Sequence, residues 1–213
     1  VLLEIMGGRA GEAQTAAFLS ALRVKGETAE EIVGMARAIG LDANYAEVTE
    51  VESFSKVGGT VVYNSHVAAV VFSGPNPYII DFSLRRYPQY HSWRTISDVE
   101  AAASFYNNIG SQHYLMAETP DDYKEAELYF TMAMKLMPDF AQAYNNLGVL
   151  RMKENNLDAA QAMYRKALEI KPGYFAPYSN LSTIYTNSGE YDRAIDLMQE
   201  AIKASPENRF AYV

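Results

Sequence analysis

The stretch YNNLGVLRMKENNLDAAQAMYRKALEIKP, residues 144–172, decides how this chain is organised. Thirty-four residues further on, the same pattern of aromatic, small and apolar residues returns and closes at Pro206. Gly148 and Ala160 are small enough to let two successive helices approach closely, and Pro172 ends the second helix because it has no backbone N–H. A repeat of this length with small residues at fixed offsets predicts a helix–turn–helix unit.

An earlier copy precedes this stretch, with Gly110, Ala126 and Pro138 in the corresponding places. Its second half keeps the spacing of 34 residues, but the first half is four residues longer than in the following copy. Four residues are about one turn of an α-helix. We therefore expect an extra helical turn near residues 115–122, where Thr119 to Asp122 makes the turn.

The repeated pattern resembles the tetratricopeptide repeat family, on Tyr144, Gly148, Ala160, Tyr164 and Pro172. This resemblance implies stacked helix pairs whose first helices line a concave groove that binds a protein or a peptide. The repeats are expected at about 103–140, 141–174 and 175–208, with a truncated fourth copy from Arg209.

The groove positions that the resemblance implies are mostly neutral polar residues. They are Asn107, Ser111, Gln142, Asn145, Val149, Met152, Lys153, Ser179, Thr183, Thr186 and Asn187. Repeat domains of this family that clamp a terminal carboxylate use clustered basic residues, and this set has one lysine. An uncharged or extended peptide suits the lining better, because an Asn amide both donates and accepts. The alternative is that these asparagines only solvate a helix face.

No capping repeat follows Pro206, although the ends of a repeat stack normally carry a polar cap. The last helix should therefore leave Ile195, Met198 and Ile202 partly uncovered. We expect self-association through this end or through the N-terminal helices, unless a longer parent protein covers it.

The fold class predicted from these patterns is mainly α with a small β part (α+β). Residues 1–39 are expected to form short helices, residues 40–98 a small antiparallel sheet with a connector, and residues 99–213 the repeat superhelix. Within the first segment, Thr28 and Glu31 form a capping-box pattern, and an apolar helical face follows from Ile32 to Ala36.

Composition narrows the function classes. The chain has 213 residues, a net charge of −8 and no cysteine. An acidic chain without a basic stripe argues against nucleic acid as a partner, and no apolar run is long enough to cross a membrane. Without Cys there is no thiolate site, and His91 and His113 lack ligand spacing, so we expect neither a metal nor a cofactor.

The chain starts at Val1 without Met and stops inside a repeat, so we expect a fragment of a longer protein. Its character is that of a soluble bacterial protein, of the cytoplasm or of the periplasm. Sequence alone does not choose between these compartments.

Residues 1–35 resemble the N-terminal helical subdomain of anthranilate phosphoribosyltransferases. The resemblance rests on Ile5-Met6-x-Gly8 and on the run from Ala16 to Ile32. It implies a segment that helps to form a dimer interface. The Gly-rich phosphate loop that the family carries further along is missing here, so no phosphoribosyl chemistry is expected.

Strand patterns follow from residue 41. Runs rich in β-branched residues or with alternating polarity cover 45–48, 60–63, 66–72 and 77–82. They predict a meander of three or four antiparallel strands. In the third run, Val67, Ala69 and Val71 should share one face, and Ala68, Val70 and Phe72 the other.

Residues 36–83 resemble part of a transglutaminase-like cysteine peptidase core, through the run from Ala36 to Tyr45, the strand from His66, and Tyr78 to Asp81. The resemblance implies that His66 and Asp81 match the last two members of a Cys-His-Asp triad. The nucleophile should lie near Lys25, in the segment that resembles the phosphoribosyltransferase. A chain without Cys cannot supply it, so His66 and Asp81 are interpreted as a remnant.

Three functional hypotheses remain. The first is a non-catalytic interaction scaffold that binds in the repeat groove. The second is a transglutaminase-like cysteine peptidase or amidase that has lost its nucleophile-bearing segment. The third is a dimerising module related to anthranilate phosphoribosyltransferase. Since the two N-terminal resemblances meet inside one helix, a fused or recombined reading frame is an alternative interpretation.

An aromatic and basic run from Leu84 to Arg94 joins the sheet region to the first repeat. We interpret it as a packed loop rather than a nucleic-acid patch, because it is short and the chain is acidic. Ser97 and Glu100 form a second capping-box pattern that should open the first repeat helix.

Overall fold

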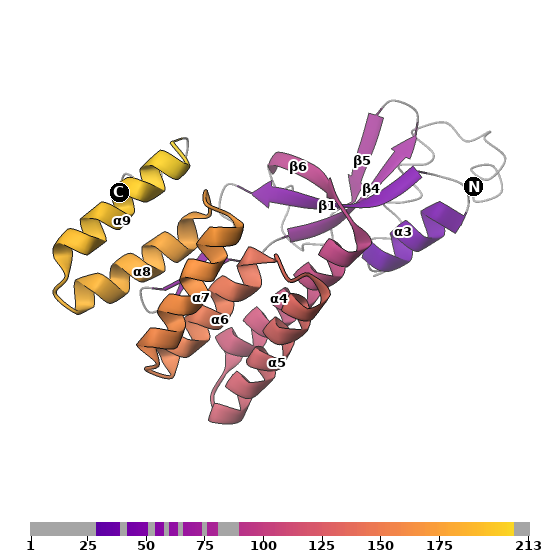
Figure 1. Ribbon diagram of the computed structural model, residues 1–213. Coiled ribbons are helices and arrows are strands. Elements are labelled where there is room, and N and C mark those ends of the chain that lie inside the picture. The colour runs from indigo at the N-terminus through magenta and orange to yellow at the C-terminus, as the bar shows by residue number, and fades with distance from the viewer. Residues whose placement is uncertain are drawn as a thin grey trace. The chain divides into compact units, whose positions relative to one another are not determined.

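The computed structural model describes residues 29–38, 42–50, 54–57, 60–63, 66–73, 76–80 and 90–206 (Figure 1). The chain divides into two compact units. One comprises Val1–Glu52 and Ser65–Ala101, and the other comprises Ser53–Asn64 and Ala102–Val213. The prediction of a mainly α chain with a small antiparallel sheet is confirmed. None of the helices in the described ranges is long and apolar enough to span a membrane.

The first unit contains a four-stranded antiparallel sheet in the order β5-β4-β1-β6. Its elements are α3 (Ala29–Ala38), β1 (Asp42–Glu50), β4 (His66–Ser73), β5 (Asn76–Ile80) and β6 (Tyr90–Ile96). β1 and β4 pair directly, with Val48 opposite His66. The chain between them is therefore an insertion in this sheet.

Two strand predictions need correction. Residues 60–63 do form a strand, β3, but it pairs with β2 (Phe54–Val57) and not with β4. The end of the run from Leu84 to Arg94, predicted as a packed loop, belongs to an edge strand, β6, which pairs with β1. Its alternation was obscured by aromatic and charged residues, which an edge strand tolerates because one side of it faces water.

A small apolar core joins α3 to the sheet. Ile32, Val33 and Ala36 are buried, as the helical pattern predicted, and α3 packs on β1 and β4. Ala68 and Val70 form a cluster with Ala46 and the partly buried Phe72, which confirms the face predicted for that strand. Thr28, the expected cap of α3, lies outside the described residues.

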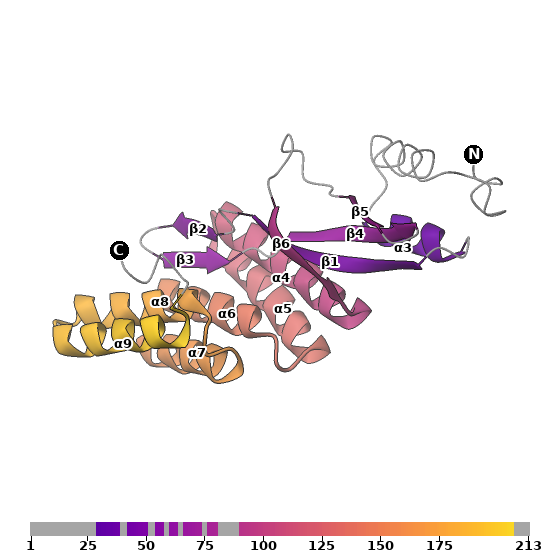
Figure 2. The same cartoon turned by 90° about the horizontal axis from the view of Figure 1, so that it is seen from above.

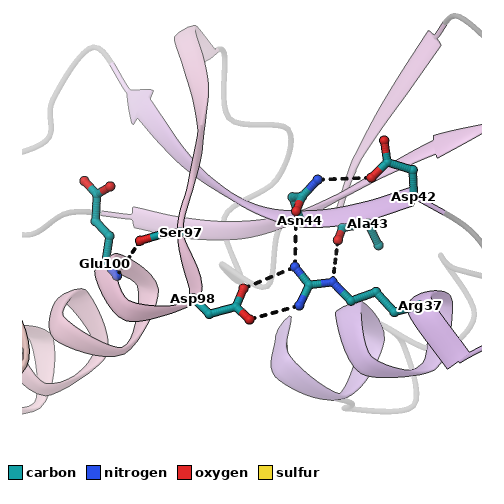
Figure 3. A network of polar contacts seen from close by, with 7 residues as sticks. All are labelled: Arg37, Asp42, Ala43, Asn44, Ser97, Asp98 and Glu100. Atoms are coloured by element: carbon teal, nitrogen blue, oxygen red, sulfur yellow. Dashed lines mark hydrogen bonds and ion pairs between the residues drawn. The ribbon is translucent and has the colours of Figure 1, made fainter.

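The first turn of α4 (Asp98–Met116) is held by Arg37 of α3 (Figure 3). The guanidinium donates to both carboxylate oxygens of Asp98 at 3.1 Å, and its Nε donates to the carbonyl of Ala43 at 2.7 Å. Nη2 also donates to Asn44 Oδ1 at 3.1 Å. The bond to Asp98 raises the pKa of Arg37. Because the two side chains are 40% and 66% exposed, the pair contributes only about 0.2–1 kcal/mol.

Ser97 caps α4, because its Oγ accepts from the backbone N–H of Glu100 at 3.1 Å. Glu100 does not complete the predicted capping box. Its carboxylate accepts instead from Arg94 of β6, whose Nε also donates to Glu47 of β1 at 2.9 Å. These two carboxylates, the bond to Glu100 first, raise the pKa of Arg94. The helix start is thus fixed to two strands of the sheet.

The second unit is built from helix pairs. Their bounds are α4 from Ala102 onwards with α5 (Pro120–Leu136), α6 (Ala141–Lys153) with α7 (Leu157–Ile170), and α8 (Phe175–Asn187) with α9 (Tyr191–Ala204). The four extra residues of the first copy lengthen its helices. After the glycine that the two copies share, α4 continues for six residues and α6 for five, and before the alanine that they share, α5 has six residues and α7 has three. The expected fourth copy from Arg209 lies outside the described residues.

Close helix approach explains the small residues of the repeat. A Cβ placed on Gly148 would lie 2.6 Å from Tyr164 Cε1, and one on Gly110 would lie 2.7 Å from Phe130 Cε1. Both rings are buried, as are Ala126 and Ala160 in the facing helices. At the other end of the array, Ile195 is 55% exposed, which agrees with an uncovered face on α9.

The first turn of α5 is closed by the carboxylate of Asp122. Its Oδ2 accepts from the backbone N–H of Thr119 at 2.8 Å, from the Thr119 hydroxyl at 2.8 Å and from the N–H of Glu118 at 3.1 Å. These bonds, the one from the Thr119 backbone first, lower the pKa of Asp122. The carboxylate therefore contributes to stability above the ordinary pKa of about 3.9 and loses this contribution as pH falls through the lowered value.

We expect an Asp122→Asn variant to lack this pH-dependent contribution. Between about pH 4 and pH 2, its thermal midpoint, followed by helical circular dichroism, should fall less steeply than that of the unsubstituted chain. Asp139→Asn, in the exposed turn before α6, removes the same charge and serves as the control. Equal acid slopes for the two variants would contradict the assignment.

Candidate peptide-binding groove

The first helices of the three pairs, α4, α6 and α8, carry the buried polar residues of the described part of the chain. They are Ser104, Asn107, Ser111, Gln142, Asn145, Asn146 and Asn180. Burying an amide costs free energy unless it is hydrogen-bonded. We therefore expect these buried polar side chains of α4, α6 and α8 to be hydrogen-bonded to one another.

Four of these residues form a continuous row of amide hydrogen bonds, here called the asparagine ladder. Asn180 Nδ2 donates to Asn145 Oδ1 at 3.0 Å, and Asn145 Nδ2 donates to Asn146 Oδ1 at 3.1 Å. Asn146 Nδ2 in turn donates to Asn107 Oδ1 at 2.9 Å and to Ser111 Oγ at 3.1 Å. The ladder thus links all three helices side chain to side chain.

At its Asn107 end, the asparagine ladder has a side-chain N–H group that donates to no other group in the described residues. The side chain of Asn107 is 0% exposed, and its Nδ2 has no hydrogen-bond partner in the described part of the structure. An unpaired buried N–H costs about 1–3 kcal/mol. This position can therefore donate to a carbonyl that is brought to it.

The structure divides the predicted groove residues into four groups by burial and surroundings. Asn107, Ser111 and Asn145 are buried and take part in the hydrogen bonds of the asparagine ladder. Gln142 is also buried and lies on α6. Ser179 and Thr183 on α8 and Met152 on α6 are half-buried, while Lys153, Thr186 and Asn187 are exposed. Val149 is buried in the helix core with Tyr164 and Leu181.

Two ladder members, Asn146 and Asn180, were not among the predicted groove residues. A signal for them exists in the sequence, because they stand 34 residues apart at the same offset of successive repeats. An asparagine that recurs at one offset places amides at the same height on neighbouring helices. In the structure each donates to an asparagine of the preceding repeat that stands one position earlier, Asn180 to Asn145 and Asn146 to Asn107.

Positive charge is scarce at the groove positions. Lys153 is the one charged residue of the predicted set, and it is exposed near the end of α6. Arg151, on the same helix, is paired with Glu127 and with Glu154, the latter at 2.7 Å. Bonds to Glu127 first, and then to Glu154, raise the pKa of Arg151. Neither residue forms part of a basic cluster for a carboxylate.

A two-stranded hairpin lies on the same helices. β2 and β3 pair antiparallel from Phe54 opposite Tyr63 to Val57 opposite Thr60. β3 contacts both α6 and α8. Figure 2 shows this hairpin on the side of α6 and α8 that faces away from α7 and α9. Two of the three helices that carry the ladder, α6 and α8, are therefore also the helices that meet the hairpin.

The predicted remnant of a catalytic pair is only partly described. His66 is the first residue of β4, opposite Val48 of β1, and Asp81 lies outside the described residues. The pairing of His66 with Asp81 therefore stays a prediction. Among the side chains that the structure describes, no group of three His, Cys, Asp or Glu residues is placed to hold a metal ion.

Comparison with protein families gives two matches. Residues 119–183 and 151–213 match the tetratricopeptide repeat family. Residues 1–39 match the helical bundle domain of a glycosyl transferase family. The prediction of tetratricopeptide repeats is thus confirmed, and residues 1–39 match a second family, as their resemblance implied. The matches do not support the transglutaminase-like resemblance of residues 36–83.

Curated relatives include anthranilate phosphoribosyltransferases of several bacteria. The chain is 42% identical over 78 residues to an anthranilate phosphoribosyltransferase of Dehalococcoides mccartyi, covering 35% of this chain and 23% of the relative. It is 32% identical over 146 residues to the Leifsonia xyli enzyme, covering 66% of this chain and 39% of the relative. The chain therefore spans about a quarter to two fifths of the length of these relatives.

Solved structures resemble about half of the chain. A crystal structure of MamA is 26% identical, with a TM-score of 0.43, covering 49% of this chain and 59% of MamA. The first tetratricopeptide repeat domain of Spaghetti (RPAP3), bound to the HSP90 peptide SRMEEVD, is 16% identical, with a TM-score of 0.45. That likeness covers 53% of this chain and 89% of the RPAP3 domain.

Proposed function

We propose that this chain is a protein-interaction scaffold that binds an extended, uncharged peptide segment along α4, α6 and α8. The observation that carries the proposal is the asparagine ladder, which spans the three helices and ends in the unpaired Nδ2 of Asn107. Function here is binding and not turnover. Two of the three helices, α6 and α8, lie in the residues that match the tetratricopeptide repeat family.

Amide chemistry supports an extended backbone as the ligand. A peptide backbone offers N–H and C=O groups in alternation, and an Asn side chain meets either one. The Nδ2 of Asn107 supplies a donor at one end of the ladder. At the half-buried positions, Ser179 and Thr183 add hydroxyl groups and Met152 adds an adaptable apolar surface.

The charge pattern supports an uncharged ligand over an acidic one. A terminal carboxylate needs several clustered cations to replace its hydration. At the groove positions only Lys153 is available, and it is exposed. With a net charge of −8, the chain as a whole also repels acidic peptides.

An array of synthetic dodecapeptides tests this proposal. One half of the array is uncharged and rich in β-branched residues, and the other half ends in acidic residues with a free carboxylate. The array is probed with the intact chain and with a variant in which Asn-Gly replaces residues 51–63. We expect binding to the uncharged half by at least one of these forms.

A single substitution then locates the site. Thr183→Arg places a long cation at a half-buried position of α8 and should weaken the selected peptide at least tenfold, or about 1.4 kcal/mol. Ala162→Arg introduces the same side chain at an exposed position of α7 and should leave binding unchanged. Preference for the acidic half, no binding by either form, or equal behaviour of the two variants would refute the proposal.

A further inference from the structure

The hairpin β2–β3 is not needed to close the sheet of the first unit. β1 and β4 are antiparallel neighbours with Val48 opposite His66, an arrangement that a two-residue turn can join. Instead, the chain between them forms a separate two-stranded ribbon that belongs to the compact unit of the repeats. The role of the hairpin is therefore argued from its contacts with the helices of the repeats.

Those contacts are with two of the three helices that carry the asparagine ladder. β3 meets α6 and α8, which carry Asn145, Asn146 and Asn180. Asn145 and Asn180 are 0% and 1% exposed, although the first helices of such repeats line a groove that is open to solvent in a bare array. The contact of β3 with α6 and α8 places the hairpin on two of the helices that carry these buried amides.

The hairpin also has the chemistry proposed for the ligand. Residues 53–64 read SFSKVGGTVVYN, in which Lys56 is the one charged residue. β3 is extended and rich in β-branched side chains, and each edge of a two-stranded ribbon presents unpaired backbone N–H and C=O groups. Amides of the ladder type are suited to such an edge.

We infer that the hairpin of residues 54–63 occupies the peptide groove of its own chain and competes there with an external ligand. The inference rests on the proposed function, because it concerns access to the same groove. The partner is then an extended segment that resembles β3, and it binds by displacing the hairpin. The insertion between β1 and β4 thus acts as a built-in occupant of the groove.

Tethering gives the hairpin a strong advantage over a free ligand. It is anchored through short connections on both sides, at Glu50 of β1 and at His66 of β4. Short tethers correspond to effective concentrations of about millimolar. An external peptide of micromolar affinity should therefore bind the intact chain at least tenfold more weakly than a chain without the hairpin.

A labelled peptide of residues 53–64 provides the probe. Its binding is measured by fluorescence anisotropy to the intact chain and to the variant with Asn-Gly in place of residues 51–63, after circular dichroism has verified helicity. We expect the variant to bind at least tenfold more tightly than the intact chain. A peptide with aspartate for both Val61 and Val62 is the matched control and should bind neither form. Equal affinities of the unmodified peptide for both forms would overturn the inference.

Engineered cysteines test the occupancy without deleting anything, and they decide the matter if the peptide binds neither form. Since the chain has no native cysteine, Thr183→Cys combined with either Val61→Cys or Val62→Cys gives a single thiol pair. Adjacent strand residues point to opposite sides, so one combination should form a disulfide under mild oxidation and the other should not. The absence of a disulfide in both combinations would overturn the inference.

The two proposals fail in different ways. If array peptides bind the intact chain and the variant equally, the groove binds ligands but the hairpin does not compete. If neither form binds array peptides while the disulfide forms, the hairpin is seated and the groove is only its packing surface. Binding by the variant alone supports both proposals.

Discussion

Replacing Gly148 by alanine should lower the free energy of unfolding of the repeats by about 1–3 kcal/mol. The added Cβ would lie 2.6 Å from Cε1 and 2.8 Å from Cδ1 of Tyr164, whose ring is fully buried. This overpacking outweighs the gain of about 0.5–1 kcal/mol that alanine usually brings to a helix. Urea denaturation followed at 222 nm measures the change.

Gly34 provides the control, because a Cβ on it meets nothing within 4 Å in α3. Gly34→Ala should therefore be neutral or stabilising. A stabilising Gly148→Ala variant would contradict the close packing of the two helices.

The third repeat suggests how to rescue this variant. At the positions of Gly148 and Tyr164 it has Ser182 and Met198, so a larger residue on the first helix accompanies a flexible one on the second. Tyr164→Met should cost less in the Gly148→Ala background than alone. A double-mutant cycle should give a favourable coupling of about 0.5–3 kcal/mol, and strict additivity would contradict this account.

Replacing Asn146 by alanine should destabilise the repeats by about 2–3 kcal/mol. Asn146 Nδ2 is the donor to both Asn107 Oδ1 and Ser111 Oγ, and both acceptors are buried. Its removal takes the donor away from Asn107 Oδ1, and a buried polar group left without its hydrogen bond costs about 1–3 kcal/mol. Equilibrium urea denaturation is again the measurement.

Asn187→Ala removes the same amide from an exposed position at the end of α8 and should change stability by less than about 0.5 kcal/mol. If the two alanine variants had equal stability, the ladder would contribute nothing to the fold.

The repeats could be predicted because their signal is local. Gly148, Ala160 and Tyr164 act within one helix pair, and a spacing of 34 residues reports that packing directly. The extra turn of the first copy was also visible as four added residues, which lengthen α4 and α5.

Strand partners were harder to predict than strands. The run from Thr60 to Tyr63 was recognised as β structure, but its partner depends on pairing across Gly58 and Gly59 and on α6 and α8, which are distant in sequence. β6 was missed because an edge strand has one paired side and keeps Trp93 and Arg94 exposed. Patterns that depend on burial are weak at such an edge.

The role of the predicted groove residues in binding stays a prediction, but the structure shows how some of them are bonded. Asn107, Ser111 and Asn145 were placed on the lining by resemblance, and they proved to be hydrogen-bonded to one another or to Asn146. Asn146, one position after Asn145, completes the asparagine ladder. Whether it can do so depends on the angle at which neighbouring helices meet. Sequence spacing within one helix does not contain that angle.

The asparagine ladder has a polarity. From Asn180 through Asn145 and Asn146 to Asn107, every amide donates in the same direction, so turning one amide end for end would require turning its neighbours too. The two ends of the asparagine ladder therefore differ chemically, because Asn107 keeps an amide N–H without a partner among the described residues. A peptide backbone has a direction of its own, and along such a row its two orientations are not equivalent.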